Sequence, residues 1–207
     1  MCKTATVQVM LCGYDNTDQI TSNTNITAYE IQKELRQEVS RLNQQIKYDN
    51  LGYAGGGNYD EQGSPAEPVC LPPDPDFVKT SNGQHGHLCG AEFYSNTNVF
   101  PSNSQYQDMP CAVCRVKQAS TVIMIPGKNR CYTGWNMEYN GYLSSNYFDA
   151  VAAGSYVCID IQPEYVNGGA LWNSKSKLFF DVVAKCGSLR CPPYKENYPL
   201  TCVVCSK

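Results

Sequence analysis

Polar and apolar residues alternate at short intervals along most of this chain. In one stretch the apolar residues instead recur with the period of a helix. Successive apolar residues in that stretch are spaced by four, four, three and four positions, which places them on one face of an amphipathic helix. Thr27 and Glu30 have the spacing of a capping box, so the pattern predicts a helix of about five turns over residues 27–47. The residues on its apolar face are Ile31, Leu35, Val39, Leu42 and Ile46.

This amphipathic helix has two interpretations. It can lie on its own domain with the apolar face covered, or it can form a short coiled coil that joins protomers, with the apolar face as the oligomer contact. Glu38 stands where a strict heptad requires an apolar residue, which weakens the coiled-coil interpretation and leaves both open.

The rest of the chain predicts short strands, and several of its passages occur twice. Residues 69–72 (VCLP) correspond to 157–160 (VCID), residues 75–78 (PDFV) correspond to 163–166 (PEYV), and each half ends on Cys-x-Val-Cys. We therefore expect a mostly β protein of two pseudo-repeated, disulfide-stapled subdomains, packed as one unit because each is small for an independent core. The expected boundaries are 1–114 for the first repeat, with the helical insertion at about 14–50, and 115–207 for the second.

Composition agrees with this fold class and argues against several functions. The chain of 207 residues is 42% hydrophobic and 17% charged, with 15 Tyr, 16 Gly and 12 Pro, a balance that suits short strands and many turns. Its net charge of −3 gives no reason to expect nucleic acid or an anionic membrane as a partner. No apolar run approaches the roughly 18 residues that a membrane-spanning helix needs.

Twelve cysteines are the strongest compositional signal. The Cys-x-x-Cys motifs at 111–114 and 202–205 lie far apart, and the chain has only two histidines. This distribution argues against a compact zinc site and favours disulfides formed in an oxidising compartment. Asn25 begins an Asn-Ile-Thr sequon, a candidate glycan acceptor that points the same way. Because no apolar segment follows Met1, we expect a mature or trimmed form of a secreted chain.

A set of motifs gives the chain a family resemblance. They are Cys-Ala-Val-Cys at 111–114, Cys131 with Gly-Trp at 134–135, Gly-Tyr at 141–142, Cys158 and the terminal Cys-x-Val-Cys. With them the chain resembles the C-terminal non-collagenous domain of type IV collagen, and most closely the C-terminal region of invertebrate short-chain collagens. The resemblance covers nearly all of residues 52–207, whereas residues 13–50 depart from it. No collagenous Gly-X-Y period occurs.

The resemblance, and not the spacing of the cysteines, implies a set of disulfide pairs. The family pattern leaves Cys2 and Cys89 over, so we expect them to form an additional bridge with each other. Such a network implies a rigid extracellular domain, with each bridge contributing about 2–4 kcal/mol to stability. The pairs that the family pattern implies are Cys131–Cys205, Cys158–Cys202, Cys12–Cys114, Cys70–Cys111 and the local loop Cys186–Cys191.

Candidate catalytic groups are few, and we expect the protein not to be an enzyme. With all cysteines paired, no thiolate nucleophile remains. Asp74, Asp76 and Glu92 offer the carboxylates of an extracellular glycoside hydrolase, but the prolines around the two aspartates also favour a turn in which they cap backbone amides.

A metal site is a second candidate chemistry. His85 and His87 lie on the same side of an extended segment and form a candidate chelate for a divalent metal, with Asp74 or Asp76 as a third ligand. The ordinary explanation is a solvent-facing loop. No dinucleotide or phosphate-binding fingerprint occurs, so no cofactor is indicated.

The aromatic residues leave two functions open, because they can present flat faces to sugars or to a partner protein. In β proteins such residues most often pack in the core or in cross-strand pairs. The candidates are Tyr132, Trp135, Tyr139, Tyr142, Tyr147 and Trp172.

These observations together favour a secreted, non-enzymatic assembly or adhesion module of the extracellular matrix. The resemblance implies a homo-oligomer, with a trimer favoured, in which the domain selects and registers its partners by exchanging β-structure. A matrix protein or a glycan is a further expected partner. The alternative is an extracellular ligand-binding protein, a lectin or small-molecule binder that uses its aromatic surface with or without a metal.

Overall fold

The computed structural model describes residues 52–78, 84–94, 97, 99–101, 103–113, 119–166, 169 and 175–207. All of them belong to one of the two compact units into which the chain divides. The features that lie outside the described residues are the expected helix over 27–47 with its apolar face, the insertion at 14–50, the sequon at Asn25, and Cys2, Cys12 and Cys114.

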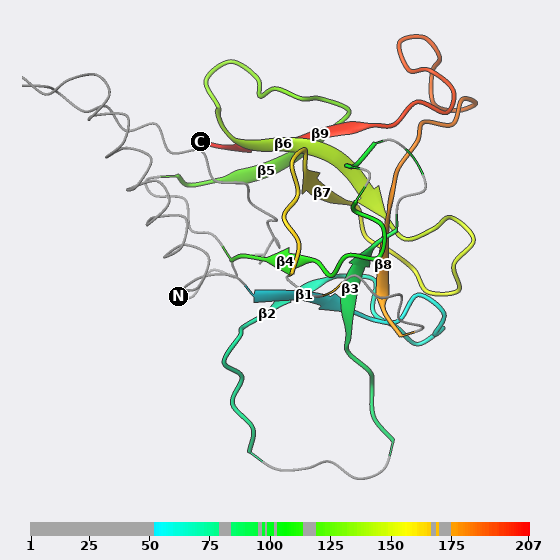
Figure 1. Ribbon diagram of the computed structural model, residues 1–207. Helices are drawn as coiled ribbons and strands as arrows, with labels where there is room; N and C mark the ends of the chain where they lie inside the picture. Colours follow the sequence, from blue (N-terminus) through cyan, green and yellow to red (C-terminus); the bar gives the residue numbers. More distant parts are fainter. Residues whose placement is uncertain are drawn as a thin grey trace, which may run out of the picture. The chain divides into compact units, whose positions relative to one another are not determined.

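Strands make up the regular secondary structure of the described residues, and no helix occurs among them, so the prediction of a mostly β protein is confirmed. The strands are β1 (Gly52–Gly56), β2 (Val69–Leu71), β3 (Cys89–Phe93), β4 (Pro110–Cys111), β5 (Val122–Pro126), β6 (Asn136–Ser145), β7 (Val157–Asp160), β8 (Lys177–Asp181) and β9 (Thr201–Ser206). They join into one sheet of order β2-β1-β3-β8-β6-β9-β5, with β4 pairing on β1 and β7 on β6 (Figure 1).

Two strands, β1 and β6, each organise three partners. Strand β1 pairs antiparallel with β2, β3 and β4, and β6 pairs antiparallel with β7, β8 and β9. A parallel ladder between β3 and β8, in register from Ala91↔Lys177 to Phe93↔Phe179, connects the two groups. The sheet therefore runs through both of the expected halves.

A glycine lies at the same place in each of these two strands, opposite the first cysteine of a Cys-x-Val-Cys motif. A Cβ on Gly52 would lie 2.2 Å from the carbonyl oxygen of Leu71, and a Cβ on Gly141 would lie 1.7 Å from that of Ile159. Both distances are far shorter than van der Waals contact. Only glycine lets β2 and β7 approach so closely.

The hydrophobic core mixes side chains from both halves of the chain. One buried cluster contains Phe93 and Met109 from the first half together with Ile159 and Phe179 from the second. Another is built around Leu143 and its neighbours in the second half. Because the first cluster needs both halves, neither half keeps that core alone.

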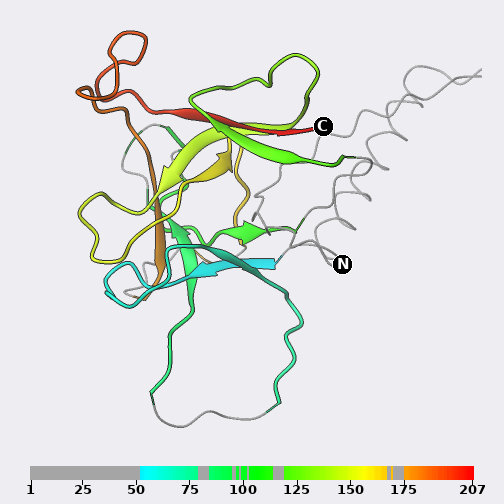
Figure 2. The same cartoon turned by 180° about the vertical axis from the view of Figure 1, so that it is seen from behind.

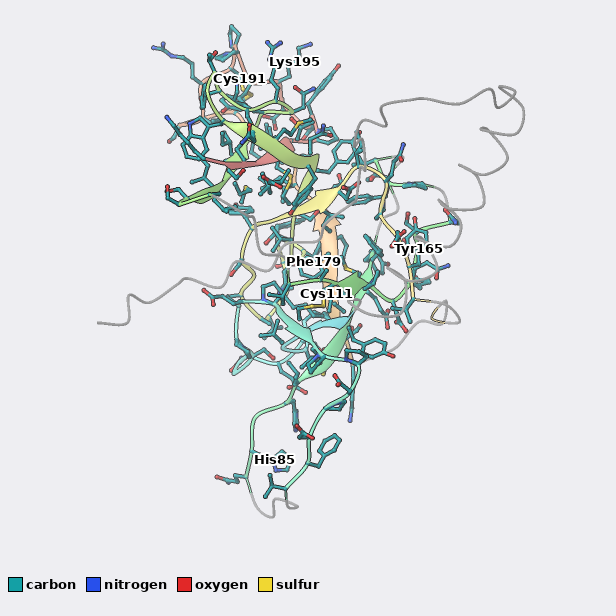
Figure 3. The ribbon with its side chains drawn as sticks, turned by 90° about the vertical axis from the view of Figure 1, so that its left-hand side faces the viewer. His85, Cys111, Tyr165, Phe179, Cys191 and Lys195 are labelled. Atoms are coloured by element: carbon teal, nitrogen blue, oxygen red, sulfur yellow. A yellow bond between two sulfur atoms is a disulfide. The ribbon has the colours of Figure 1, made fainter. Side chains whose placement is uncertain are left out.

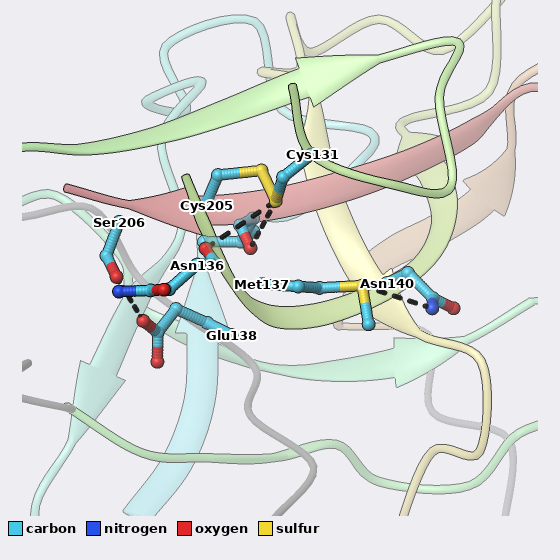
Figure 4. The surroundings of a disulfide bond; sticks show 8 residues. Cys131, Asn136, Met137, Glu138, Asn140, Cys205 and Ser206 are labelled. Atoms are coloured by element: carbon cyan, nitrogen blue, oxygen red, sulfur yellow. Dashed lines mark hydrogen bonds between the residues drawn. A yellow bond between two sulfur atoms is a disulfide. The ribbon is translucent and has the colours of Figure 1, made fainter. Parts of the chain in front are cut away.

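Disulfides fix the outer partners of β1 and β6. Cys70–Cys111 joins β2 to β4, and Cys158–Cys202 joins β7 to β9. Cys131–Cys205 ties the loop before β6 to β9 (Figure 4), and Cys186–Cys191 closes a short loop before β9. All four bridges are pairs that the family resemblance implies.

The surroundings of Cys131–Cys205 show how the ends of β6 and β9 are held together (Figure 4). The Ser206 hydroxyl donates to the carboxylate of Glu138, and the Asn140 amide nitrogen lies 3.7 Å from the sulfur of Met137. A register shift between Met137 and Tyr139 marks a bulge here, which increases the local twist of β6.

Removing the buried bridge with Cys158→Ala and Cys202→Ala is expected to lower the free energy of unfolding by about 4 kcal/mol, because it frees a loop with a sequence separation of 44. The control, Cys186→Ala with Cys191→Ala, opens a bridge with a separation of 5 and is expected to cost about 2 kcal/mol. Denaturant titration of both variants measures the difference. Equal losses would contradict this explanation.

The close approach of β6 and β7 predicts that Gly141→Ala destabilises the protein by about 3 kcal/mol, because a side chain there collides with backbone. Gly90→Ala is the matched control in β3, since a Cβ there has nothing within 4 Å. It is expected to change stability by less than about 1 kcal/mol. Thermal unfolding followed by circular dichroism tests the contrast, and similar midpoints for the two variants would refute it.

Candidate functional site

A segment after β7 packs against the first half of the chain. The Val166 N–H donates to the carbonyl of Asp108 at 3.0 Å. The Tyr165 ring meets Phe93 edge to face, with centroids 5.4 Å apart, and its hydroxyl lies 2.7 Å from Ser104 Oγ. Tyr165 and Val166, the seated segment, therefore combine backbone pairing with core packing.

The corresponding segment of the first half is exposed. Phe77 and Val78 match Tyr165 and Val166 in the sequence, yet Phe77 is 89% exposed and Val78 is 95% exposed. We call Phe77 and Val78 the uncovered segment. It lies on the long connection between β2 and β3, which projects away from the sheet in both views (Figures 1 and 2). Leu88, near the start of β3, is also exposed.

Both histidines lie on the same connection, and His85 lies at the lowest end of the described residues in Figure 3. Their ring centroids are 5.6 Å apart, and His87 Nδ1 lies 3.0 Å from Glu61 Oε2, on the turn after β1. The hydrogen bond with His87, followed by one from Asn58, lowers the pKa of the Glu61 carboxyl. This contact ties the connection to the body of the sheet.

The described residues contain no group of three His, Cys, Asp or Glu side chains that could hold a metal ion. Asp74 and Asp76 are exposed on the connection and do not complete a site with His85 and His87. The expected chelate with an aspartate as third ligand is therefore not formed, and His87 contacts Glu61 instead.

Cys89 carries a free thiol in the part of the chain that the structure describes. Its expected partner Cys2 lies outside the described residues, so the Cys2–Cys89 bridge stays a prediction. That pair joined the two cysteines that the family pattern left over, and no residue pattern supported it. Cys89 begins β3, where burial, followed by the negative charge of Glu61, raises the pKa of the thiol. The neutral thiol is favoured at neutral pH, which makes Cys89 a poor nucleophile.

The three carboxylates considered for hydrolysis occupy different environments. Asp74 and Asp76 are exposed on the connection after β2, whereas Glu92 is 2% exposed inside β3. Glu92 bridges to Asp108 through the backbone, and burial raises the pKa of the Asp108 carboxyl. A glycosidase needs two carboxyl groups that flank one bond, and carboxylates split between solvent and sheet interior do not supply that arrangement.

The aromatic candidates divide between core and surface. The Tyr139 hydroxyl donates to the carbonyl of Cys158 at 3.0 Å, so this ring is a core residue with its polar end satisfied. Tyr139 and Tyr142 pack in or against the core, Tyr132 and Tyr147 are exposed, Trp135 is half-buried, and Trp172 lies outside the described residues.

The structure also contains a row of aromatic rings that the sequence did not indicate. It runs from Phe148 through Tyr147, Phe180 and Tyr94 to Tyr106, with successive centroids 4.5, 5.2, 4.7 and 5.5 Å apart. The rings come from four distant parts of the chain. No local pattern could have shown that they meet.

The buried Lys177 also gave no signal in the sequence. It lies in β8, 1% exposed, and its ammonium donates to Asn146 Oδ1 at 3.1 Å. Burial lowers the pKa of this ammonium. A Cβ on Gly56 would lie 2.4 Å from Cδ of the Lys177 side chain, so the glycine in β1 leaves the space that the lysine side chain fills.

Comparison of the chain with protein-family models, with curated proteins and with solved structures gives no match. In the part of the chain that the structure describes, there is no helix long and apolar enough to cross a membrane. Function must therefore be inferred from the residues and their geometry.

The free thiol predicts that iodoacetamide labels Cys89 in the native, unreduced protein, whereas Cys70 and Cys158 stay unlabelled. Because the pKa of Cys89 is raised, its labelling rate should still be rising as the pH passes the ordinary value of 9.0. Peptide mass spectrometry after labelling at a series of pH values measures this. A Cys2–Cys89 cross-linked peptide in place of the label would contradict the free thiol and support the expected bridge.

Proposed function

We propose that the protein is a secreted, non-enzymatic structural module that assembles with copies of itself by exchanging β-structure. Four disulfides among the described residues support an oxidising, extracellular setting, where small domains depend on such bridges. The trimer, the matrix role and the type of module come from the resemblance to the collagen C-terminal domain.

The matching strand pairing of the two halves supports this proposal. Strands β1 to β4 have the same pairing scheme as β6 to β9. Backbone bonds recur at matching positions: Tyr106 N–H to the carbonyl of Phe93 in the first half corresponds to Asn197 N–H to that of Ala184 in the second. Tyr106 and Asn197 are also the two non-glycine residues with positive φ in the described part of the chain, both at 62°.

The observation that carries the proposal is that two segments with matching sequences differ in burial. The seated segment, Tyr165 and Val166, is held by the first half of its own chain, while the uncovered segment, Phe77 and Val78, faces solvent. The matching strand pairing of the two halves supports a second receiving surface of the same kind. The backbone bridge between Val183 and Pro199 corresponds to that between Glu92 and Asp108, the edge on which the seated segment pairs.

The occupant expected on that second surface is the uncovered segment of another copy. Each copy then gives one segment and receives one, which makes the contact head-to-tail. Such contacts close into a ring when the rotation between copies permits, and the ring implied by the resemblance is a trimer. The seated segment shows the kind of contact expected, one backbone hydrogen bond beside one aromatic ring in the core.

The exchange predicts that Phe77→Ser with Val78→Ser converts a trimer into monomers. Each contact loses about 4 kcal/mol, the approximate value of burying one Phe and one Val side chain. Light scattering at several protein concentrations measures the mass. Phe148→Ser with Val151→Ser is the matched control, because both residues are exposed and apolar but lie on another loop.

The control variant is expected to keep the mass of the native protein. Native protein that is a monomer would overturn the assembly function and favour the ligand-binding alternative. Loss of the trimer in the control but not in the Phe77 variant would move the contact away from the uncovered segment.

A further inference from the structure

Positive charge is concentrated in two loops. The loop 127–135 between β5 and β6 and the loop 182–200 between β8 and β9 together carry five Lys and Arg residues and one Glu. The rest of the chain carries eleven Lys and Arg residues against eighteen Asp and Glu. A protein of net charge −3 therefore has one strongly basic region. Its cations, which we call the basic face, are Lys128, Arg130, Lys185, Arg190 and Lys195.

The two loops adjoin each other. The Gly127 N–H donates to the carbonyl of Thr201 at 2.7 Å, and the Tyr194 hydroxyl lies 3.4 Å from where a Cβ on Gly127 would be. Cys191 and Lys195 lie at one end of the described unit and His85 at its opposite end (Figure 3). The basic face is thus far from the connection that carries the uncovered segment.

Two of the cations lie over exposed tyrosine rings. Lys128 Nζ is 4.8 Å from the centroid of Tyr132, and Lys195 Nζ is 5.0 Å from that of Tyr198. Both tyrosines are 59% exposed. Each pair presents an ammonium next to a flat apolar ring, so it can attract an anionic group and also pack against the C–H face of a sugar.

The single carboxylate in these loops does not compete with a ligand. Glu196 lies 3.6 Å from Lys185 and also accepts a hydrogen bond from the backbone N–H of Cys186. It is therefore engaged within its own loop, while Arg130, Arg190 and Lys195 remain exposed.

Disulfides hold both loops in place before any ligand binds. Cys131–Cys205 anchors the first loop to β9, and Cys186–Cys191 closes a turn within the second. A surface that is ordered in advance loses less conformational freedom on binding, which favours affinity.

We propose that the basic face binds a sulfated polysaccharide. Sulfate groups supply the negative charge that the cations of the basic face attract, and the pyranose rings between the sulfates can pack against the exposed rings of Tyr132 and Tyr198. Nucleic acid is less suited to a protein stapled by disulfides for an oxidising compartment. A lipid surface is less suited because these loops have no amphipathic helix with which to enter it.

Heparin is the probe that tests this proposal, by surface plasmon resonance at an ionic strength of about 0.15 M. The native protein is expected to bind heparin and not chemically desulfated heparin. The triple variant Lys128→Gln, Arg130→Gln and Arg190→Gln is expected to bind roughly 100-fold more weakly, at roughly fivefold for each charge removed from a polyanionic contact. A map of the disulfides confirms that the variant is folded.

A charge-compensated variant separates local from overall charge. This variant adds three substitutions to the triple variant and so returns it to the net charge of the native protein. The substituted residues are exposed and lie outside the basic face: Asp74→Asn, Asp76→Asn and Asp149→Asn. Binding is expected to stay weak. The proposal is overturned if the native protein does not bind heparin, if compensation restores binding, or if single-stranded DNA or phosphatidylserine vesicles bind as tightly as heparin.

Repeating the titration on Phe77→Ser with Val78→Ser shows whether binding needs self-assembly, so the two proposals can fail separately.

Discussion

The parallel ladder between β3 and β8 is the interaction on which the rest of the structure depends. It joins strands that lie far apart in the sequence and makes one sheet from two groups that are otherwise organised around β1 and β6. Because Phe93 and Phe179 end this ladder and belong to the same buried cluster, backbone pairing and core packing reinforce each other. The disulfides then act within each group, where they hold β2 to β4 and β7 to β9, so covalent links and the ladder have separate tasks.

The same arrangement explains why the two halves do not behave alike. Tyr165 reaches the core of the first half and ends beside Phe93 and Ser104, which completes one edge of the sheet. Phe77 is exposed, although apolar side chains of this size gain about 1.5–3 kcal/mol from burial. Of two segments that match in sequence, one is packed and the other is exposed, and the exposed one is the contact that we propose for a second copy.

Charge and apolar exposure are separated in space. The uncovered segment lies on the connection that also carries His85, and the cations of the basic face lie on loops at the other end (Figure 3). The self-assembly and the binding of a sulfated polysaccharide that we propose therefore need not compete for the same surface. A module that joins its own copies at one end and holds matrix glycans at the other would link assembly to the surrounding matrix.

The amino-acid sequence by itself determined the local features of this protein. Short alternating runs and turn residues were enough to predict strands, and the motifs around Cys111, Cys131, Cys158 and Cys202 carried the resemblance that implied four of the bridges now seen. Only the tertiary structure decided which similar residues differ: Phe77 is exposed while Tyr165 is packed, Lys177 is buried, and Cys89 keeps a free thiol. The physical reason is that burial depends on which distant segment covers a residue. Local propensity and spacing are properties of neighbours in the chain, whereas a covering segment, such as β8 beside β3, can come from almost anywhere along it.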